Sequence, residues 1–117
     1  MADQEPQLAT GAVMIVEDEA LVAMFLADLV EDLGWVVIGP VASRAAALRA
    51  AANNRPAVAI VDVSLGSESG IGLAQELKSA FGTAVIFLSG HAHVADDQAV
   101  QEIGPAAVLQ KPCPCGN

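Results

Sequence analysis

The sequence has few basic residues, only two cysteines and no long hydrophobic run. Five Lys and Arg residues stand against fourteen Asp and Glu residues, which gives a formal net charge of −9. Such an acidic protein repels nucleic-acid phosphates and anionic membranes, so we expect no direct binding of nucleic acid. Both cysteines fall in the last five residues and cannot build a disulfide framework.

Membrane and export signals are also missing from the sequence. No apolar run approaches the roughly 20 residues that a membrane span needs. The first eleven residues, MADQEPQLATG, lack the basic and apolar regions of a signal peptide. We therefore expect a cytoplasmic protein that does not associate with membranes.

Apolar residues, by contrast, are abundant. They make up 54% of the 117 residues, which is enough for the core of one domain. We divide the chain into a flexible acidic tail at 1–11, a folded domain at 12–112 and a C-terminal tail at 113–117.

Five short apolar runs predict buried strands. They are Ala12 to Val16, Trp35 to Ile38, Ala57 to Val61, Ala84 to Leu88 and Ala106 to Leu109. Helical segments lie between them: Glu19 to Leu33, a segment capped by Ser43 that stops at or before Asn54, Ile71 to about Phe81, and about Val94 to Ile103. Strands that alternate with helices predict a doubly wound α/β fold with a parallel sheet. Only CPCGN follows Pro112, so we expect the last helix to be missing or truncated.

Polar side chains stand at the carboxyl ends of four predicted strands, where doubly wound folds place their functional residues. They are Glu17 and Asp18 after the first strand, Asp62 after the third, Ser89 after the fourth and Lys111 after the fifth. Neighbouring carboxylates repel by roughly 4 kcal/mol per pair at 4 Å and an effective dielectric of 20. They therefore need protons or a cation, and oxygen ligands on an open rim suit Mg²⁺. A carboxylate beside Mg²⁺ and an ammonium group can accept a phosphoryl group.

Four motifs, VMIVEDE, AVAIVDVSLGSESGIGL, AVIFLSGHA and VLQKP, resemble the receiver domain of bacterial two-component response regulators. The resemblance runs from about Val13 to Pro112. It implies a flavodoxin-like sheet with strand order 2-1-3-4-5. It also implies a protein that catalyses only its own phosphorylation and dephosphorylation, and that signals by protein contact.

The resemblance assigns a role to each residue of the rim. Asp62 would receive the phosphoryl group from a histidine kinase or a phosphotransfer protein. Mg²⁺ would be bound by Asp18, Asp62 and the backbone carbonyl of Ser64, with Glu17 acting through water. Lys111 would pair with the phosphoryl group, and Ser89 would move to hydrogen-bond it. The Lys111–Pro112 peptide bond would be cis.

The sequence departs from the family pattern at several positions. Glu17 replaces the commoner Asp, and Val108 stands where the family usually has an aromatic switch residue. The fourth strand resembles a subgroup in which this strand ends in Phe-Ala-Thr-Gly. His91 is a candidate for controlling how water reaches an aspartyl phosphate. The pair Cys113 and Cys115 is expected to form an exposed tail, because no second pair completes a zinc site.

Two alternative functions and one interface remain open. A degenerate receiver would act as a phosphorylation-independent interaction or dimerisation scaffold. A phosphohydrolase commonly has a second Asp two residues after its nucleophile, where this chain has Ser64. The first helix is apolar nearly all round in its first half, and Met24 shares a stripe with Asp28. Exposed apolar patches mark interfaces, so we expect a homodimer or a tightly bound partner there, with truncation of a longer chain as the competing explanation.

Overall fold

The computed structural model describes residues 11–66, 68–90 and 98–111. In chain order the elements are β1 (Ala12–Val16), α1 (Ala20–Asp32), β2 (Val36–Val41), α2 (Arg44–Asn53), β3 (Val58–Asp62), β4 (Ser64–Leu65), β5 (Glu68–Ser69), α3 (Gly70–Phe81), β6 (Ala84–Ser89), α4 (Gln98–Ile103) and β7 (Ala107–Gln110). No helix within the described residues is long and apolar enough to cross a membrane.

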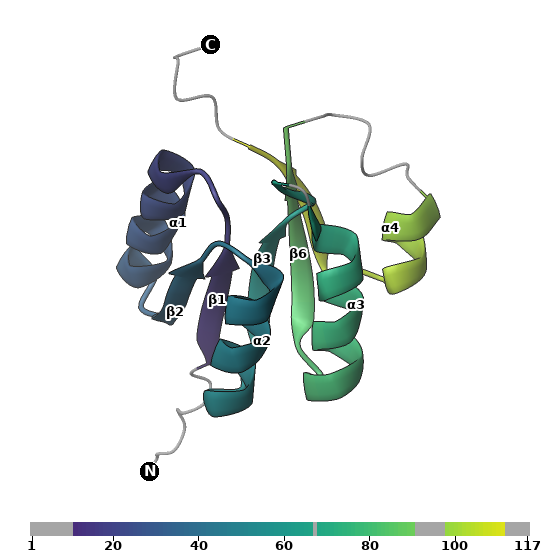
Figure 1. Cartoon of the computed structure of the whole chain (residues 1–117). Coiled ribbons are helices and arrows are strands. Elements are labelled where there is room, and N and C mark those ends of the chain that lie inside the picture. The colour runs from purple at the N-terminus through teal and green to yellow at the C-terminus, as the bar shows by residue number, and fades with distance from the viewer. Residues whose placement is uncertain (1–10, 67, 91–97, 112–117) are drawn as a thin grey trace.

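Five parallel strands form one sheet in the order β2-β1-β3-β6-β7. Helix α1 packs on one face of this sheet, and α2, α3 and α4 pack on the other (Figure 1). Counted among the strands of this sheet alone, the order is the predicted 2-1-3-4-5, so the doubly wound, flavodoxin-like fold is confirmed. The strand order reverses between β1 and β3, and the carboxyl ends of strands at such a point border a crevice.

Side chains alternate along the strands between two apolar cores, because successive residues of a strand point to opposite faces. The core under α2, α3 and α4 includes Met14, Val16, Val61, Phe87, Leu73 and Leu77. The core under α1 includes Val13, Ile15, Ile60, Leu88, Leu26 and Val30. Burial on both faces explains why these strands read as nearly continuous apolar runs in the sequence.

Serine side chains cap two of the helices, and a glycine ends one of them. The hydroxyl of Ser43 accepts a hydrogen bond from the amide of Ala46 at 3.2 Å and caps α2, as predicted. The hydroxyl of Ser69 accepts one from the amide of Gly72 and caps α3. At the other end of α3, Gly82 adopts a φ of 68°, the left-handed conformation that glycine tolerates best.

The structure differs from the sequence predictions in two local features. Strand β2 continues to Val41 instead of closing at Ile38, because a register shift between Met14 and Val16 accommodates Gly39 and Pro40 in this edge strand. The segment predicted as a loop contains a short antiparallel pair, β4 with β5.

Several predictions fall on residues that the structure does not describe. They concern the N-terminal tail at 1–10, the start of the fourth helix, the cis bond before Pro112 and the residues after it. Within the described ranges, no helix follows β7.

Gly70 fixes the approach of α3 to the carboxyl end of β3. Its amide donates a hydrogen bond to the carbonyl of Val63 at 2.8 Å. A Cβ atom at this position would lie 1.8 Å from the carbonyl oxygen of Asp62. Any larger residue at Gly70 therefore pushes directly on the backbone that positions Asp62.

We predict that Gly70→Ala destabilises the fold by at least the roughly 1–3 kcal/mol that overpacking costs, because the clash is with backbone atoms. Gly72→Ala is the matched control. Nothing lies within 4 Å of a Cβ at Gly72, and alanine favours a helix over glycine by about 1 kcal/mol. Thermal unfolding should show a lower Tm for Gly70→Ala only. An unchanged Tm for Gly70→Ala would contradict the close approach.

Candidate functional site

The predicted rim residues lie where the strands of the sheet end. Asp62 is the last residue of β3 and Ser89 the last residue of β6. Glu17 and Asp18 directly follow β1, and Lys111 directly follows β7. Because β1, β3, β6 and β7 are successive neighbours in a parallel sheet, their carboxyl ends meet at one edge.

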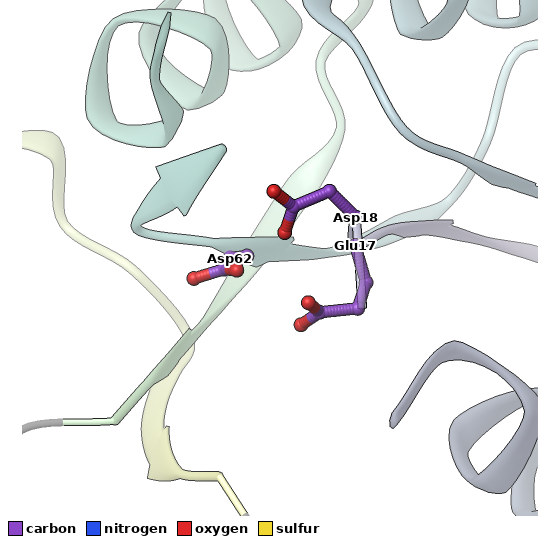
Figure 2. Close-up of side chains that lie close together, drawn as sticks. All are labelled: Glu17, Asp18 and Asp62. Carbon is purple, nitrogen blue, oxygen red and sulfur yellow. The ribbon is translucent and has the colours of Figure 1, made fainter. Parts of the chain in front are cut away.

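Three carboxylates converge at this edge, as Figure 2 shows. Glu17, Asp18 and Asp62 each offer an oxygen, and these oxygens all lie within 4.8 Å of one another. Glu17 and Asp62 are only 3% and 2% exposed, whereas Asp18 is open to solvent. The cluster is therefore a largely buried group of like charges with one side accessible to solvent.

One ammonium group compensates part of this charge. Lys111 Nζ lies 2.9 Å from Asp62 Oδ2 and 3.2 Å from Glu17 Oε2. The lysine is positioned by its own backbone, since its amide donates to the carbonyl of Ser89 at 2.6 Å. A third carboxylate, that of Glu19, lies 2.5 Å from Lys111 Nζ.

The environment shifts the pKa values of Glu17 and Lys111. Burial, and to a smaller extent the charge of Asp62, raise the pKa of Glu17 to about 7, although the Glu19 amide and Lys111 act to lower it. Burial alone lowers the pKa of Lys111, but its contacts with the carboxylates of Glu19, Asp62 and Glu17 outweigh burial and raise this pKa above its ordinary value. The lysine therefore stays charged, while Glu17 holds a proton more readily than an exposed glutamate.

The two serines of the rim take different positions. Ser64 is exposed, and its backbone amide donates a hydrogen bond to Asp62 Oδ1 at 3.0 Å. Asp side chains commonly accept such a bond from the backbone amide two residues later. Ser89 is 3% exposed and contributes its carbonyl to Lys111. These contacts fix the orientation of the Asp62 carboxylate and the position of the lysine.

The donor set of the rim fits a hard divalent cation. Glu17 Oε1 is buried and has no hydrogen-bond partner among the described residues. Asp62 Oδ2 is also buried and makes only the ion pair with Lys111, without hydrogen-bond geometry. Oxygen ligands that are partly open to water are those that Mg²⁺ prefers, so Glu17, Asp18 and Asp62 have the chemistry to hold it.

Sequence reasoning missed Glu19 as a residue of this site. The signal was present as a third consecutive acid, in Glu17-Asp18-Glu19, but Glu19 was assigned only to the start of a helix. Val108, in place of the expected aromatic residue, is half-buried against the core under α2, α3 and α4. His91, His93, Cys113 and Cys115 lie outside the described residues.

The fold and the rim together define a flavodoxin-like α/β domain with an acidic site at the switch point of its sheet. The family model for the response regulator receiver domain matches residues 13–116. The chain therefore belongs to the response regulator receiver domain family.

Individual relatives agree with this assignment. The phyllosphere-induced regulator PhyR of Methylorubrum extorquens is 37% identical over 81 residues, which cover 68% of this chain and 30% of PhyR. The chain thus spans less than a third of that relative's length.

Among solved structures, the signal receiver domain of a modulated diguanylate cyclase from Desulfovibrio desulfuricans G20 is 33% identical with a TM-score of 0.79, covering 87% of this chain and 82% of that one. A response regulator from Burkholderia pseudomallei, described with a phosphorylated aspartic acid and a calcium ion, is 25% identical with a TM-score of 0.78, covering 88% and 61%.

Proposed function

We propose that this domain accepts a phosphoryl group on Asp62 in the presence of Mg²⁺ and signals by protein contact. The donor would be a histidine kinase or a phosphotransfer protein. The domain would catalyse only its own phosphorylation and dephosphorylation. Family membership supports a place in a two-component phosphorelay, which operates in the cytoplasm.

The observation that carries this proposal is the environment of the Asp62 carboxylate. One of its oxygens accepts the amide of Ser64, and the other faces the ammonium of Lys111 without a hydrogen bond. The carboxylate is thus oriented, beside a fixed cation, at an edge that Asp18 leaves open to solvent. The phosphorylated aspartic acid and the calcium ion described for the similar Burkholderia pseudomallei response regulator support the same chemistry here.

The transfer step requires no further acid or base from the protein. An oxygen of Asp62 attacks the phosphorus of a phosphohistidine, the phosphorus–oxygen bond forms, and the phosphorus–nitrogen bond to the imidazole breaks. The leaving nitrogen keeps the electron pair of the broken bond, and the imidazole departs as a neutral ring because its other nitrogen carries a proton. Bound Mg²⁺ would neutralise charge on the phosphoryl oxygens.

Lys111 supplies the fixed positive charge of this step. Its ammonium already lies beside Asp62, so it needs little movement to contact a phosphoryl group on that residue. Ser89 is buried and is the last residue of β6, the strand next to β3. We assign it the hydrogen bond to the phosphoryl group that the family resemblance implies.

We predict that wild-type protein gains one phosphoryl group from phosphoramidate only when Mg²⁺ is present, and that Asp62→Asn gains none. Glu31→Gln, which removes an exposed acid on α1, should be labelled like the wild type. Intact mass spectrometry measures all of these. Equal labelling of Asp62→Asn would move the acceptor elsewhere. A folded wild type that is never labelled would favour the alternative function, a scaffold that works without phosphorylation.

The metal ligands give a second prediction. Loss of a residue that contacts a metal only through water typically weakens metal binding by roughly 10–100-fold. Asp18→Asn should weaken Mg²⁺ binding by more than this, because Asp18 is assigned as a direct ligand. Glu17→Gln should stay within that range, because Glu17 acts through water. Titration calorimetry with Mg²⁺ measures both, and the reverse order of the two variants would overturn the ligand assignment.

We also infer that a second copy of this chain packs on α1. This helix and its C-cap residue expose five large apolar side chains, between 45% and 68% accessible: Leu21, Met24, Phe25 and Leu29 on α1, and Leu33 directly after it. They continue into an apolar groove of about 230 Å³, which lies between Leu33 and Trp35 on one side and Val58 and Ile86 of the sheet on the other. Burying each such side chain contributes about 1.5–3 kcal/mol.

The charges of α1 favour an antiparallel second copy as the occupant. The three charged residues of α1, Asp28, Glu31 and Asp32, are all acidic and lie in its C-terminal half. Acids at a helix C-terminus oppose the helix dipole. In an antiparallel pair, the acidic half of one helix would lie beside the uncharged N-terminal half of the other, whose dipole is positive.

We predict a dimer at micromolar concentration that Phe25→Glu converts to a monomer. Ala52→Glu is the matched control, because it adds the same charge at an exposed position of α2, on the other face of the sheet. Light scattering coupled to size-exclusion chromatography reports the mass. A monodisperse wild-type monomer would contradict the inference, as would a dimer that survives Phe25→Glu.

A further inference from the structure

Glu19 is the closest partner of Lys111, although it stands outside the carboxylate cluster. The distance from Lys111 Nζ to Glu19 Oε1 is 2.5 Å, against 2.9 Å to Asp62 and 3.2 Å to Glu17. The carboxylate oxygens that lie within 4.8 Å of one another come from Glu17, Asp18 and Asp62, and Glu19 is not part of this group. Glu19 therefore contacts the lysine of the site without belonging to the donor set for a metal.

The side chain of Glu19 does not cap the helix that it precedes. Glu19 occupies the N-cap position of α1 with an extended backbone, where a Ser, Thr, Asp or Asn side chain usually accepts an amide of the first turn. Its side chain makes no such bond and reaches across to Lys111 instead. The contact with Lys111 therefore does not compete with a capping hydrogen bond of α1.

The ammonium of Lys111 has three donors, and three carboxylates face them. Two of these donors make hydrogen bonds to Glu17 and Glu19, while Asp62 is held by charge alone. A phosphoryl group on Asp62 brings further oxygens to the ammonium, and these oxygens compete with Glu17 and Glu19 for its donors. The side chains of Glu17 and Asp62 are 0% and 3% exposed, whereas that of Glu19 is 58% exposed. Releasing Glu19 costs less than releasing Glu17, because water solvates the Glu19 carboxylate, whereas the buried Glu17 carboxylate would keep only the bond from the Glu19 amide and gain no water.

We propose that Glu19 is a positioning residue that holds Lys111 before phosphorylation and slows phosphoryl acceptance. The Lys111–Glu19 pair is the one that gives way when the phosphoryl group arrives. The negative charge of Glu19 also opposes the approach of an anionic phosphodonor. This inference rests on the proposed function of Asp62 and adds a residue that tunes its rate.

The first part of the test observes the lysine directly. The chain has only two lysines, Lys78 and Lys111. Lys78 donates to the carbonyls of Ile103 and Gly104 at the end of α4 and so serves as an internal reference. In protein labelled on lysine, Glu19→Gln should shift the side-chain NMR signals of Lys111 and leave those of Lys78 in place. The control Glu31→Gln removes the same charge from α1 and should shift neither.

The second part measures rate and metal affinity. With phosphoramidate and saturating Mg²⁺, Glu19→Gln should raise the phosphorylation rate about two- to fivefold, the effect expected for loss of an exposed ion pair. Glu31→Gln should match the wild type. The Mg²⁺ dissociation constant of Glu19→Gln should stay within about twofold of the wild-type value, because Glu19 is not a ligand. A merely structural role for Glu19 would lower the rate or the stability instead.

The outcomes separate this inference from the proposed function. If the wild type is labelled at Asp62, but Glu19→Gln changes neither the phosphorylation rate nor the Lys111 signals, the role of Glu19 is wrong. The proposed function of Asp62 then still stands. A wild type that is not labelled overturns the proposed function, and the rate-setting role of Glu19 fails with it.

Discussion

The site depends on the burial of two carboxylates, Glu17 and Asp62, at the end of a parallel sheet, with one ammonium group to compensate them. Removing charge from water is costly unless each charge is paired. Here the pairing is incomplete, since a buried oxygen of Glu17 has no hydrogen-bond partner among the described residues and Asp62 Oδ2 is held only by the charge of Lys111. The raised pKa of Glu17 has the same origin. An added divalent cation would relieve this imbalance, which links metal binding to the same residues that would accept a phosphoryl group.

The fold brings these charges together through strand order. Consecutive strands β1, β3, β6 and β7 end at one edge, so residues up to 94 positions apart in the sequence meet there. Gly70 lets α3 start against the backbone of Asp62, and the amide of Ser64 orients its carboxylate. Among the described residues, α1 is the helix that packs on its side of the sheet, and it carries several of the large exposed apolar side chains.

The sequence predicted the sheet and the main rim because both depend on strong local patterns. Apolar runs marked all five strands of the sheet, and the polar residues that end them converge in the structure. Other features depend on tertiary contacts that no local pattern carries. Strand β2 extends past Pro40 because it lies at the edge of the sheet, and β4 pairs with β5 inside a segment rich in Gly and Ser. The contact of Glu19 with Lys111 joins residues 92 positions apart and becomes visible only in the folded chain.

The central claim is that Asp62, Lys111 and a bound Mg²⁺ form one phosphoryl-binding site. Beryllium fluoride mimics a phosphoryl group on a carboxylate, and fluorine NMR detects its bound form directly. Wild-type protein should show bound fluoride signals that require Mg²⁺ and are absent in Asp62→Asn. Bound signals that persist without Mg²⁺ or in Asp62→Asn, or a folded wild type that shows none, would contradict the claim.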